Sequence, residues 1–107
     1  PYFIQLGDGE LIYLAGIWRK ELQNDKKVRV FSIITRHANS KIKHIHNRMP
    51  IILNLNEAFE YMDKEKSDKI INDKITSDGD IDLKFHEVSK YVNNPQNNDL
   101  KCIEPIN

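Results

Sequence analysis

The sequence Ile33-Ile34-Thr35-Arg36-His37-Ala38-Asn39 changes from an apolar run to polar and charged residues, and Ile51-Ile52-Leu53 restores the apolar pattern after Pro50. Between these two runs, residues 36–48 contain four Lys or Arg and three His. Buried strands seldom end in so many titratable groups by chance. We therefore expect the first strand to bring Thr35 to the rim of a site, and the following loop to return His46 and Arg48 to the same rim.

The charges of this 107-residue chain cancel overall but are unevenly distributed. Nine Lys or Arg between Arg19 and Arg48 stand against two acids, a net charge of +7, whereas ten acids between Glu57 and Glu87 stand against five Lys, a net charge of −5. A basic half of this kind can bind phosphates, although ordinary solvated faces also carry charge clusters. Because the basic half coincides with the histidines, we favour phosphate binding.

The length and composition predict at most one domain. No apolar run approaches the roughly 20 residues that span a bilayer, and no signal-peptide pattern opens the sequence. Cys102 is the only cysteine, so an internal disulfide is impossible and a reducing, cytoplasmic compartment is favoured. The chain begins at Pro1, and we expect it to be a piece of a longer protein.

Two aromatic and β-branched runs near the start of the chain predict a β-hairpin. They are Tyr2–Leu6 and Leu11–Trp18, and the intervening Gly7-Asp8-Gly9-Glu10 can supply the positive φ that tight turns require. Gly16 inside the second run predicts a bulge or a close backbone approach. We expect Trp18 to lie in the core, with a stacking surface as the alternative.

The rest of the pattern predicts short elements. A polar loop is expected over 21–27, followed by a strand over 28–35 that is covered on both faces, a turn over 38–43 and a short buried strand over 51–53. Asn54 and Glu57 form a capping-box pattern for a helix over 55–63, whose Leu55, Phe59 and Met62 should face the core.

Beyond this helix the pattern is weaker. One further helical turn is expected over 67–72, and a loop over 76–80 whose acids, continuing to residue 82, lack the spacing of a calcium-binding EF-hand. A last strand over 85–88, a turn over 93–95 and a tail without helix complete the prediction.

Three interpretations of the histidines are open on spacing alone. His44 and His46 would point to one side of an extended segment, where His37 or His86 could complete a zinc site, but no Cys pair or His-Glu-x-x-His helix supports this, so no metal is expected. His46 could instead be a structural residue in a polar corner. It could also be a general acid/base, since imidazole ordinarily titrates near about pH 6.5.

The same residues resemble a known family. Thr35 and the stretch His46-Asn47-Arg48-Met49-Pro50 resemble the His-x-Arg-Met-Pro core of the SOS-response-associated peptidase (SRAP) family, whose members crosslink to abasic sites in single-stranded DNA. Ala15-Gly16-Ile17-Trp18 resembles a middle strand of that family, and Val88 to Pro105 its C-terminal signature. The resemblance covers the chain in order, as the C-terminal portion (residues 1–107) of a single SRAP-like domain.

The resemblance implies an α+β fold, with a mixed, mostly antiparallel β-sheet or partial barrel and short helices around a basic DNA channel. It also implies DNA repair in the SOS response to DNA damage, in the cytoplasm at the nucleoid, and no cofactor. His46 matches the catalytic histidine, which assists opening of the abasic sugar, and Thr35 and Arg48 match residues that line the DNA site. Arg36, Lys41 and Lys43 are further DNA-binding candidates, and Lys26, Lys27 and Arg29 would add positive background.

The departures from the family pattern concern the covalent chemistry. The family's nucleophile is a cysteine exposed at the N-terminus after removal of the initiator Met, the self-processing that underlies the peptidase label and the associated hydrolase and lyase chemistry. Position 1 here is proline, and Cys102 falls in the tail signature. No residue matches the family's active-site glutamate or asparagine, so the chain resembles an incomplete domain with unpaired sheet edges that favour self-association.

Two functions from different classes fit these observations. The first is a fragment of an SRAP protein whose complete form captures abasic sites in single-stranded DNA. The second is a non-catalytic nucleic-acid-binding module that keeps the basic rim without the nucleophile. A plain structural domain would show no DNA affinity even at low salt.

We expect the chain beginning at Pro1 to form no covalent adduct with an abasic oligonucleotide, because it lacks the amine–thiol pair of the family. The measurement is a denaturing gel after incubation, with and without borohydride. Borohydride would trap any iminium formed by the secondary amine of Pro1. An adduct in either sample would contradict the expectation.

Overall fold

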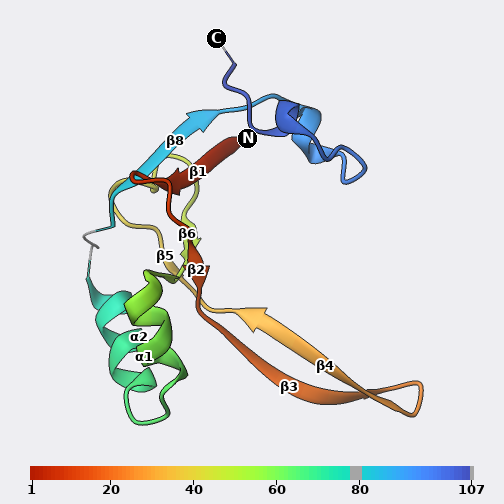
Figure 1. Cartoon of the computed structure of the whole chain (residues 1–107), viewed down its shortest axis with the longest axis vertical. Helices are drawn as coiled ribbons and strands as arrows, with labels where there is room; N and C mark the ends of the chain where they lie inside the picture. The colour runs from red at the N-terminus through yellow and green to blue at the C-terminus, as the bar shows by residue number, and fades with distance from the viewer. Residues whose placement is uncertain (78–80, 107) are drawn as a thin grey trace. The chain divides into compact units, whose positions relative to one another are not determined.

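The computed structural model describes residues 1–77 and 81–106 and shows an α+β fold built from antiparallel strands, two α-helices and two short 3-10 helices. The expected fold class is confirmed. The chain forms two compact units, one of residues 1–11 with 81–107 and one of residues 12–80 (Figure 1).

In the second unit, three two-stranded antiparallel ladders meet at one junction. Strand β2 (Tyr13–Leu14) pairs with β7 (Ile52–Leu53), β3 (Gly16–Gln23) with β4 (Lys26–Ile33), and β5 (Thr35–His37) with β6 (Arg48–Pro50). A single residue separates each strand from the next at the junction: Ala15 between β2 and β3, Ile34 between β4 and β5, and Ile51 between β6 and β7.

These three linking residues hydrogen-bond to one another in a ring. The amide of Ala15 donates to the carbonyl of Ile51 (3.0 Å), and the amide of Ile51 donates to the carbonyl of Ile34 (3.0 Å). The amide of Ile34 donates to the carbonyl of Ala15 (2.9 Å), which closes the ring. Ala15 and Ile51 are almost fully buried, at 1% and 0% exposure. Backbone groups that no ladder satisfies are thus paired inside the core, where an unpaired group would be costly.

The β3–β4 hairpin extends away from this junction and ends in a two-residue turn (Figure 1). Asn24 (φ 49°) and Asp25 (φ 62°) both have positive φ, the backbone of a type I′ turn. The expected polar loop over 21–27 is therefore wrong, because pairing continues to Gln23 and Lys26. The close approach expected at Gly16 is confirmed, since a Cβ there would lie 3.0 Å from the carbonyl oxygen of Ser32.

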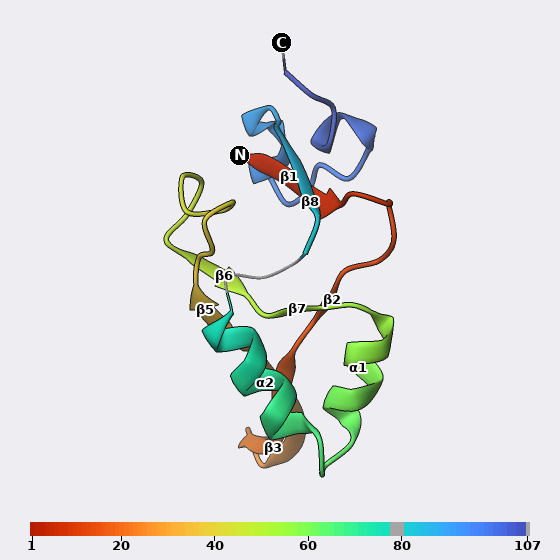
Figure 2. The same cartoon turned by 90° about the vertical axis from the view of Figure 1, so that its left-hand side faces the viewer.

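Helices α1 (Leu55–Met62) and α2 (Ser67–Thr76) lie side by side in both views (Figures 1 and 2). The capping box is confirmed: Glu57 N–H donates to Asn54 Oδ1 (2.9 Å), and Asn54 N–H donates to Glu57 Oε1 (3.0 Å). The second helix is longer than the single turn expected. An ion pair between Lys74 Nζ and Glu57 Oε2 (2.6 Å) joins the two helices.

The first unit contains a different strand pair from the one expected. Strand β1 (Tyr2–Leu6) pairs with β8 (Leu83–Glu87), from Tyr2 opposite Glu87 to Leu6 opposite Leu83. The predicted hairpin of the first two runs is therefore wrong. Gly7 N–H donates to the carbonyl of Asp82 (2.8 Å), so the chain continues the β8 pairing instead of turning back. Local turn residues could not reveal a partner this distant in sequence.

The C-terminal part of this unit is held against β8. Val88 bridges to Pro105, and the 3-10 helices η1 (Lys90–Asn93) and η2 (Leu100–Cys102) lie between them in sequence. The expected turn at 93–95 overlaps the end of η1, whereas the expectation of a tail without helix is wrong at η2. Leu83 and Val88 are buried, at 4% and 2% exposure.

Several apolar side chains that were expected in the core are exposed. Trp18 is 64% exposed, so the core assignment is wrong, and Phe31 at 75% shows that the strand over 28–35 is not covered on both faces. Leu55, Phe59 and Met62 of α1 are 52–69% exposed. The core instead consists of Ala15, Ile51 and Leu53 with half-buried neighbours from β2, α1, α2 and the junction.

The described helices include none that is long and apolar enough to cross a membrane. The expectation of no calcium site concerned the acidic loop, and residues 78–80 of that loop lie outside the described residues.

We predict that Ile51→Val lowers the free energy of unfolding by about 1 kcal/mol, because it removes one methyl group from a fully buried site. Urea denaturation followed by circular dichroism measures the change. Ile17→Val removes the same group from a residue that is 60% exposed and should cost less than about 0.5 kcal/mol. Equal losses in the two variants would contradict the central position of the junction.

Candidate functional site

The β5–β6 ladder and its connecting loop bring Thr35, His46 and Arg48 together. The ladder places Thr35 opposite Pro50 and His37 opposite Arg48. Arg48 NH2 donates a hydrogen bond of 2.9 Å to Thr35 Oγ1, across thirteen positions of sequence. All three residues are exposed. The hydroxyl and the guanidinium therefore share one solvent-facing rim, on the ladder that begins at the junction.

The imidazole of His46 is held by the backbone of Arg48. The amide of Arg48 donates to Nδ1 of His46 (3.0 Å), and the carbonyl oxygen of Arg48 lies 3.2 Å from the same nitrogen. A neutral ring with its proton on Nε2 accepts the first bond, whereas a ring protonated at Nδ1 can donate to the carbonyl. The backbone of one residue thus offers a partner to Nδ1 in either protonation state.

The loop that carries His46 is anchored by a buried asparagine that the sequence interpretation missed. Asn39 is 5% exposed, and its Oδ1 accepts a hydrogen bond from the amide of Ile42 (3.1 Å). The carbonyl of Ile42 then accepts a hydrogen bond from the amide of His46 (3.0 Å). Ile42 and Met49 are buried as well. The signal was present in the sequence: Asn39 lies in the turn expected over 38–43, where Asn side chains commonly cap backbone amides.

Arg36 lies away from the Thr35–Arg48 group. As the middle residue of β5, it alternates to the opposite side of the strand from Thr35 and His37. Its guanidinium donates to the carbonyl of Lys74 and to that of Ser77, and its Nε donates to the carbonyl of His37 (2.9 Å). The Lys74 carbonyl belongs to the last turn of α2, and Ser77 directly follows that helix. A cation at a helix C-terminus stabilises the backbone carbonyls that have no partner within the helix. Arg36 thus ties β5 to the end of α2.

The remaining basic candidates lie in two places. Lys41 and Lys43 are exposed on the turn between β5 and β6. Lys26, Lys27 and Arg29 belong to the β3–β4 hairpin, where Arg29 lies over the ring of Trp18 at 5.4 Å from its centroid. Over residues 1–77 and 81–106, no group of three or more His, Cys, Asp or Glu is placed to hold a metal ion.

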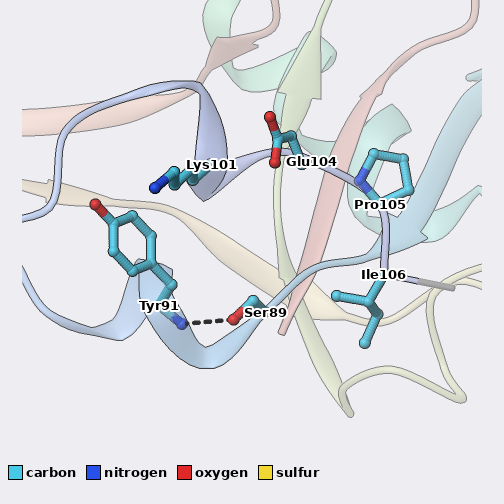
Figure 3. Close-up of a pocket in the computed structure, with 6 residues that line it drawn as sticks. All are labelled: Ser89, Tyr91, Lys101, Glu104, Pro105 and Ile106. Atoms are coloured by element: carbon cyan, nitrogen blue, oxygen red, sulfur yellow. Dashed lines mark hydrogen bonds between the residues drawn. The ribbon is translucent and has the colours of Figure 1, made fainter.

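A hollow of about 250 Å³ lies within the first unit, at a place where no site was expected (Figure 3). Tyr91 and Lys101 line it together with Ser89, Glu104, Pro105 and Ile106. The Tyr91 hydroxyl donates to Asp99 Oδ2 (2.8 Å), and this hydrogen bond raises the pKa of Tyr91 above its usual value. Its lining combines the cation of Lys101 with the anion of Glu104 and with apolar atoms. These charges favour neither an anionic nor a cationic ligand.

We predict that Asn39→Ala loosens the loop by about 1 kcal/mol, the usual cost of losing a side-chain cap. The amide of Ile42 should then exchange its hydrogen about fivefold faster, as measured by NMR. Asn47→Ala is the matched control, because Asn47 is exposed and its carbonyl still accepts the amide of Ala38. Unchanged exchange in Asn39→Ala would show that the buried side chain does not hold the turn.

Comparison with known proteins places the chain in a family. The family model described as SOS response associated peptidase (SRAP) matches residues 1–95. The abasic site processing protein YedK of Escherichia coli (strain K12) is 30% identical, over 99% of this chain and 49% of its own length. The abasic site processing protein YoqW of Bacillus subtilis (strain 168) is 29% identical, over 97% of this chain and 47% of its own.

A vertebrate relative and a solved structure agree with this assignment. The abasic site processing protein HMCES of Gallus gallus is 31% identical over 90% of this chain and 29% of its own length. A crystal structure of a protein from Bacteroides thetaiotaomicron has the same fold, with a TM-score of 0.81 at 23% identity, over 99% of this chain and 48% of that one. The chain thus spans about half the length of its bacterial relatives, and it belongs to the SRAP family.

Proposed function

We propose that this chain is part of an abasic site processing protein that binds single-stranded DNA and captures abasic sites covalently. Membership of the SRAP family and the names of the relatives support the proposal. The observation that carries it is the hydrogen bond between Arg48 and Thr35 beside the imidazole of His46, on an exposed rim. An exposed guanidinium and hydroxyl suit the binding of a phosphate. An imidazole beside them suits proton transfer to a neighbouring sugar.

His46 is proposed as the general acid/base. Opening of an abasic sugar moves a proton to the ring oxygen, and attack on the resulting aldehyde moves further protons at C1′. A side chain that does this work must be stable both with and without its extra proton. When Nδ1 donates its proton to the carbonyl of Arg48, the neutral ring has its lone pair on Nε2, and the same hydrogen bond is kept when Nε2 takes up a proton.

Arg48 is proposed to hold a phosphate of the DNA backbone. A guanidinium has five N–H donors in a planar fork that matches phosphate oxygens, and the bond to Thr35 occupies one of them. That bond also fixes the long side chain before DNA arrives, which reduces the entropy lost on binding. Thr35 would therefore act both as a hydroxyl contact and as the residue that orients Arg48.

The other basic residues are proposed to have unequal roles. Lys41 and Lys43, exposed on the loop next to His46, would add attraction for the phosphate backbone. Arg36 was a candidate for DNA contact, but its guanidinium is engaged by backbone carbonyls at the end of α2. We assign it the positioning of β5, on which Thr35 lies.

The covalent step requires groups that residues 1–107 do not supply. In the SRAP pattern, an N-terminal cysteine provides an amine and a thiol that together close on the sugar aldehyde as a thiazolidine, with loss of water. Position 1 is proline, and Cys102 is half-buried in the tail with its thiol directed to the carbonyl of Asn97 (3.5 Å). Capture, and the autoproteolytic removal of the initiator Met, are thus proposed for the complete domain.

A non-catalytic nucleic-acid-binding module is the second candidate. The observation that favours it is the net charge of +7 between Arg19 and Arg48. Such a module would bind single-stranded DNA through its phosphates, with a strong dependence on salt, and would form no adduct.

We predict that His46→Ala and Arg48→Ala act on different steps in a complete SRAP protein that carries this sequence. His46→Ala should slow adduct formation with an abasic oligonucleotide by about 10²-fold or more, because it removes the proton carrier, and should barely change affinity. Arg48→Ala should weaken binding and reduce the salt slope by about one, because one phosphate contact is lost. Denaturing gels and fluorescence anisotropy at several salt concentrations measure the two effects.

Arg19→Ala provides the matched control, since it removes the same charge from an exposed residue that is paired with Glu21 (3.2 Å). It should change the salt slope less than Arg48→Ala does. Full adduct formation in His46→Ala would remove the acid/base role. Salt-dependent binding without any adduct in the unsubstituted complete protein would favour the non-catalytic module.

A further inference from the structure

His37 lies beside the Thr35–Arg48 pair but takes no part in the hydrogen bond between those two side chains. It is the last residue of β5, and its partner in the ladder is Arg48 of β6. Side chains alternate along a strand, and residues directly opposite each other lie on the same face of a ladder. The imidazole of His37 therefore shares a face with Thr35 and Arg48. Arg36 and its partner Met49 occupy the other face.

The hydrogen bonds of the ladder determine how closely His37 approaches Arg48. The amide of Ala38 donates to the carbonyl of Asn47 (3.0 Å), so these two residues form a hydrogen-bonded pair. Hydrogen-bonded and non-hydrogen-bonded pairs alternate along an antiparallel ladder, which makes His37 and Arg48 a non-hydrogen-bonded pair. In agreement, the amide of Arg48 donates to the ring of His46 and not across the ladder. Side chains are closer in pairs of this kind, with Cβ atoms about 4.5–5.5 Å apart.

The charged groups next to His37 are basic. Arg48 faces it from β6, and on β5 the Nε of Arg36 donates to the backbone carbonyl of His37 (2.9 Å). Helix α2 meets β5 on the Arg36 side, away from the imidazole. The loop between β5 and β6 adds Lys41, Lys43, His44 and His46, and residues 35–50 contain no Asp or Glu. A protonated His37 opposite Arg48 would thus be a like-charged pair, which an anion bound between the two side chains would stabilise.

We propose that His37 is a second phosphate contact of the candidate site, and that it holds DNA in its protonated form. The neutral imidazole takes up one proton from the solvent as DNA binds, and a ring N–H then donates to a phosphate oxygen beside the guanidinium of Arg48. A hydrogen bond between two charged groups is roughly twice as strong as one between neutral groups. This role rests on the proposed binding of single-stranded DNA, and it adds a dependence on pH to that binding.

Proton uptake fixes the sign of the pH dependence. Imidazole side chains change charge between about pH 5 and pH 8. The complex keeps a proton that the free protein loses as the pH rises through this range, so the affinity for DNA should increase toward acid pH. A purely structural His37 predicts the opposite sign. Its protonation would repel Arg48, loosen the ladder and weaken DNA binding at acid pH.

The test compares DNA affinity at about pH 6 and about pH 8, on either side of the ordinary titration of imidazole. The complete SRAP protein that carries this sequence binds fluorescent oligo-dT, which has no abasic site, and anisotropy reports the affinity. The ratio of affinities at the two pH values should be about fivefold larger in the parent protein than in His37→Gln, because one charged phosphate contact is lost. His37→Lys carries a permanent cation, so it should bind more tightly than His37→Gln at the higher pH and show an equally small ratio.

His44→Gln is the matched control, because it removes an exposed imidazole from the same loop but outside the ladder. Its ratio should stay within about twofold of the parent. Equal ratios in the parent and His37→Gln, or tighter binding of the parent at the higher pH, overturn the role of His37 and leave DNA binding by Arg48 intact. An equal loss in His44→Gln overturns it too, since the effect would then come from general charge. No oligo-dT binding at either pH would overturn the proposed function, and the role of His37 with it.

Discussion

The ring of hydrogen bonds among Ala15, Ile34 and Ile51 is the constraint on which the larger unit of this protein depends. Each of these residues leaves one ladder and enters the next, so its amide and carbonyl would be unpaired if the other two were displaced. Burial of Ala15 and Ile51 excludes the water that could replace them. The three ladders are therefore fixed together at their inner ends, although each has only two strands, which alone would be marginally stable.

This ring also fixes the position of the candidate site. Thr35 directly follows Ile34, and Pro50 directly precedes Ile51, so both strands of the β5–β6 ladder start from hydrogen-bonded positions of the junction. At the outer end, Asn39 closes the loop that carries His46. The candidate side chains are exposed, while Ile51, Asn39 and Met49 beneath them are buried. This separation lets polar groups remain available to a ligand without weakening the core that holds them.

Sequence reasoning was successful where chemistry is local. The juxtaposition of Thr35 with Arg48 follows from two strands joined by one loop, and the capping box follows from Asn54 and Glu57 alone. It failed where the answer depends on distant partners. Nothing near Tyr2–Leu6 specifies β8, and the apolar character of Trp18 does not reveal that its side chain is exposed. Likewise, a positive charge at Arg36 looks the same in sequence whether it meets a phosphate or the carbonyls of a helix end.

The same architecture leaves the outer end of the β3–β4 ladder free of contacts with the junction. Since the β3–β4 arm touches the junction only at its base and closes in a two-residue turn at its tip, adding or deleting paired residues near Asn24 changes the reach of the arm and not the junction. Homologous proteins can therefore differ in arm length, in steps of two residues that preserve which side each residue faces, while the corner formed by β5 and β6 keeps its geometry.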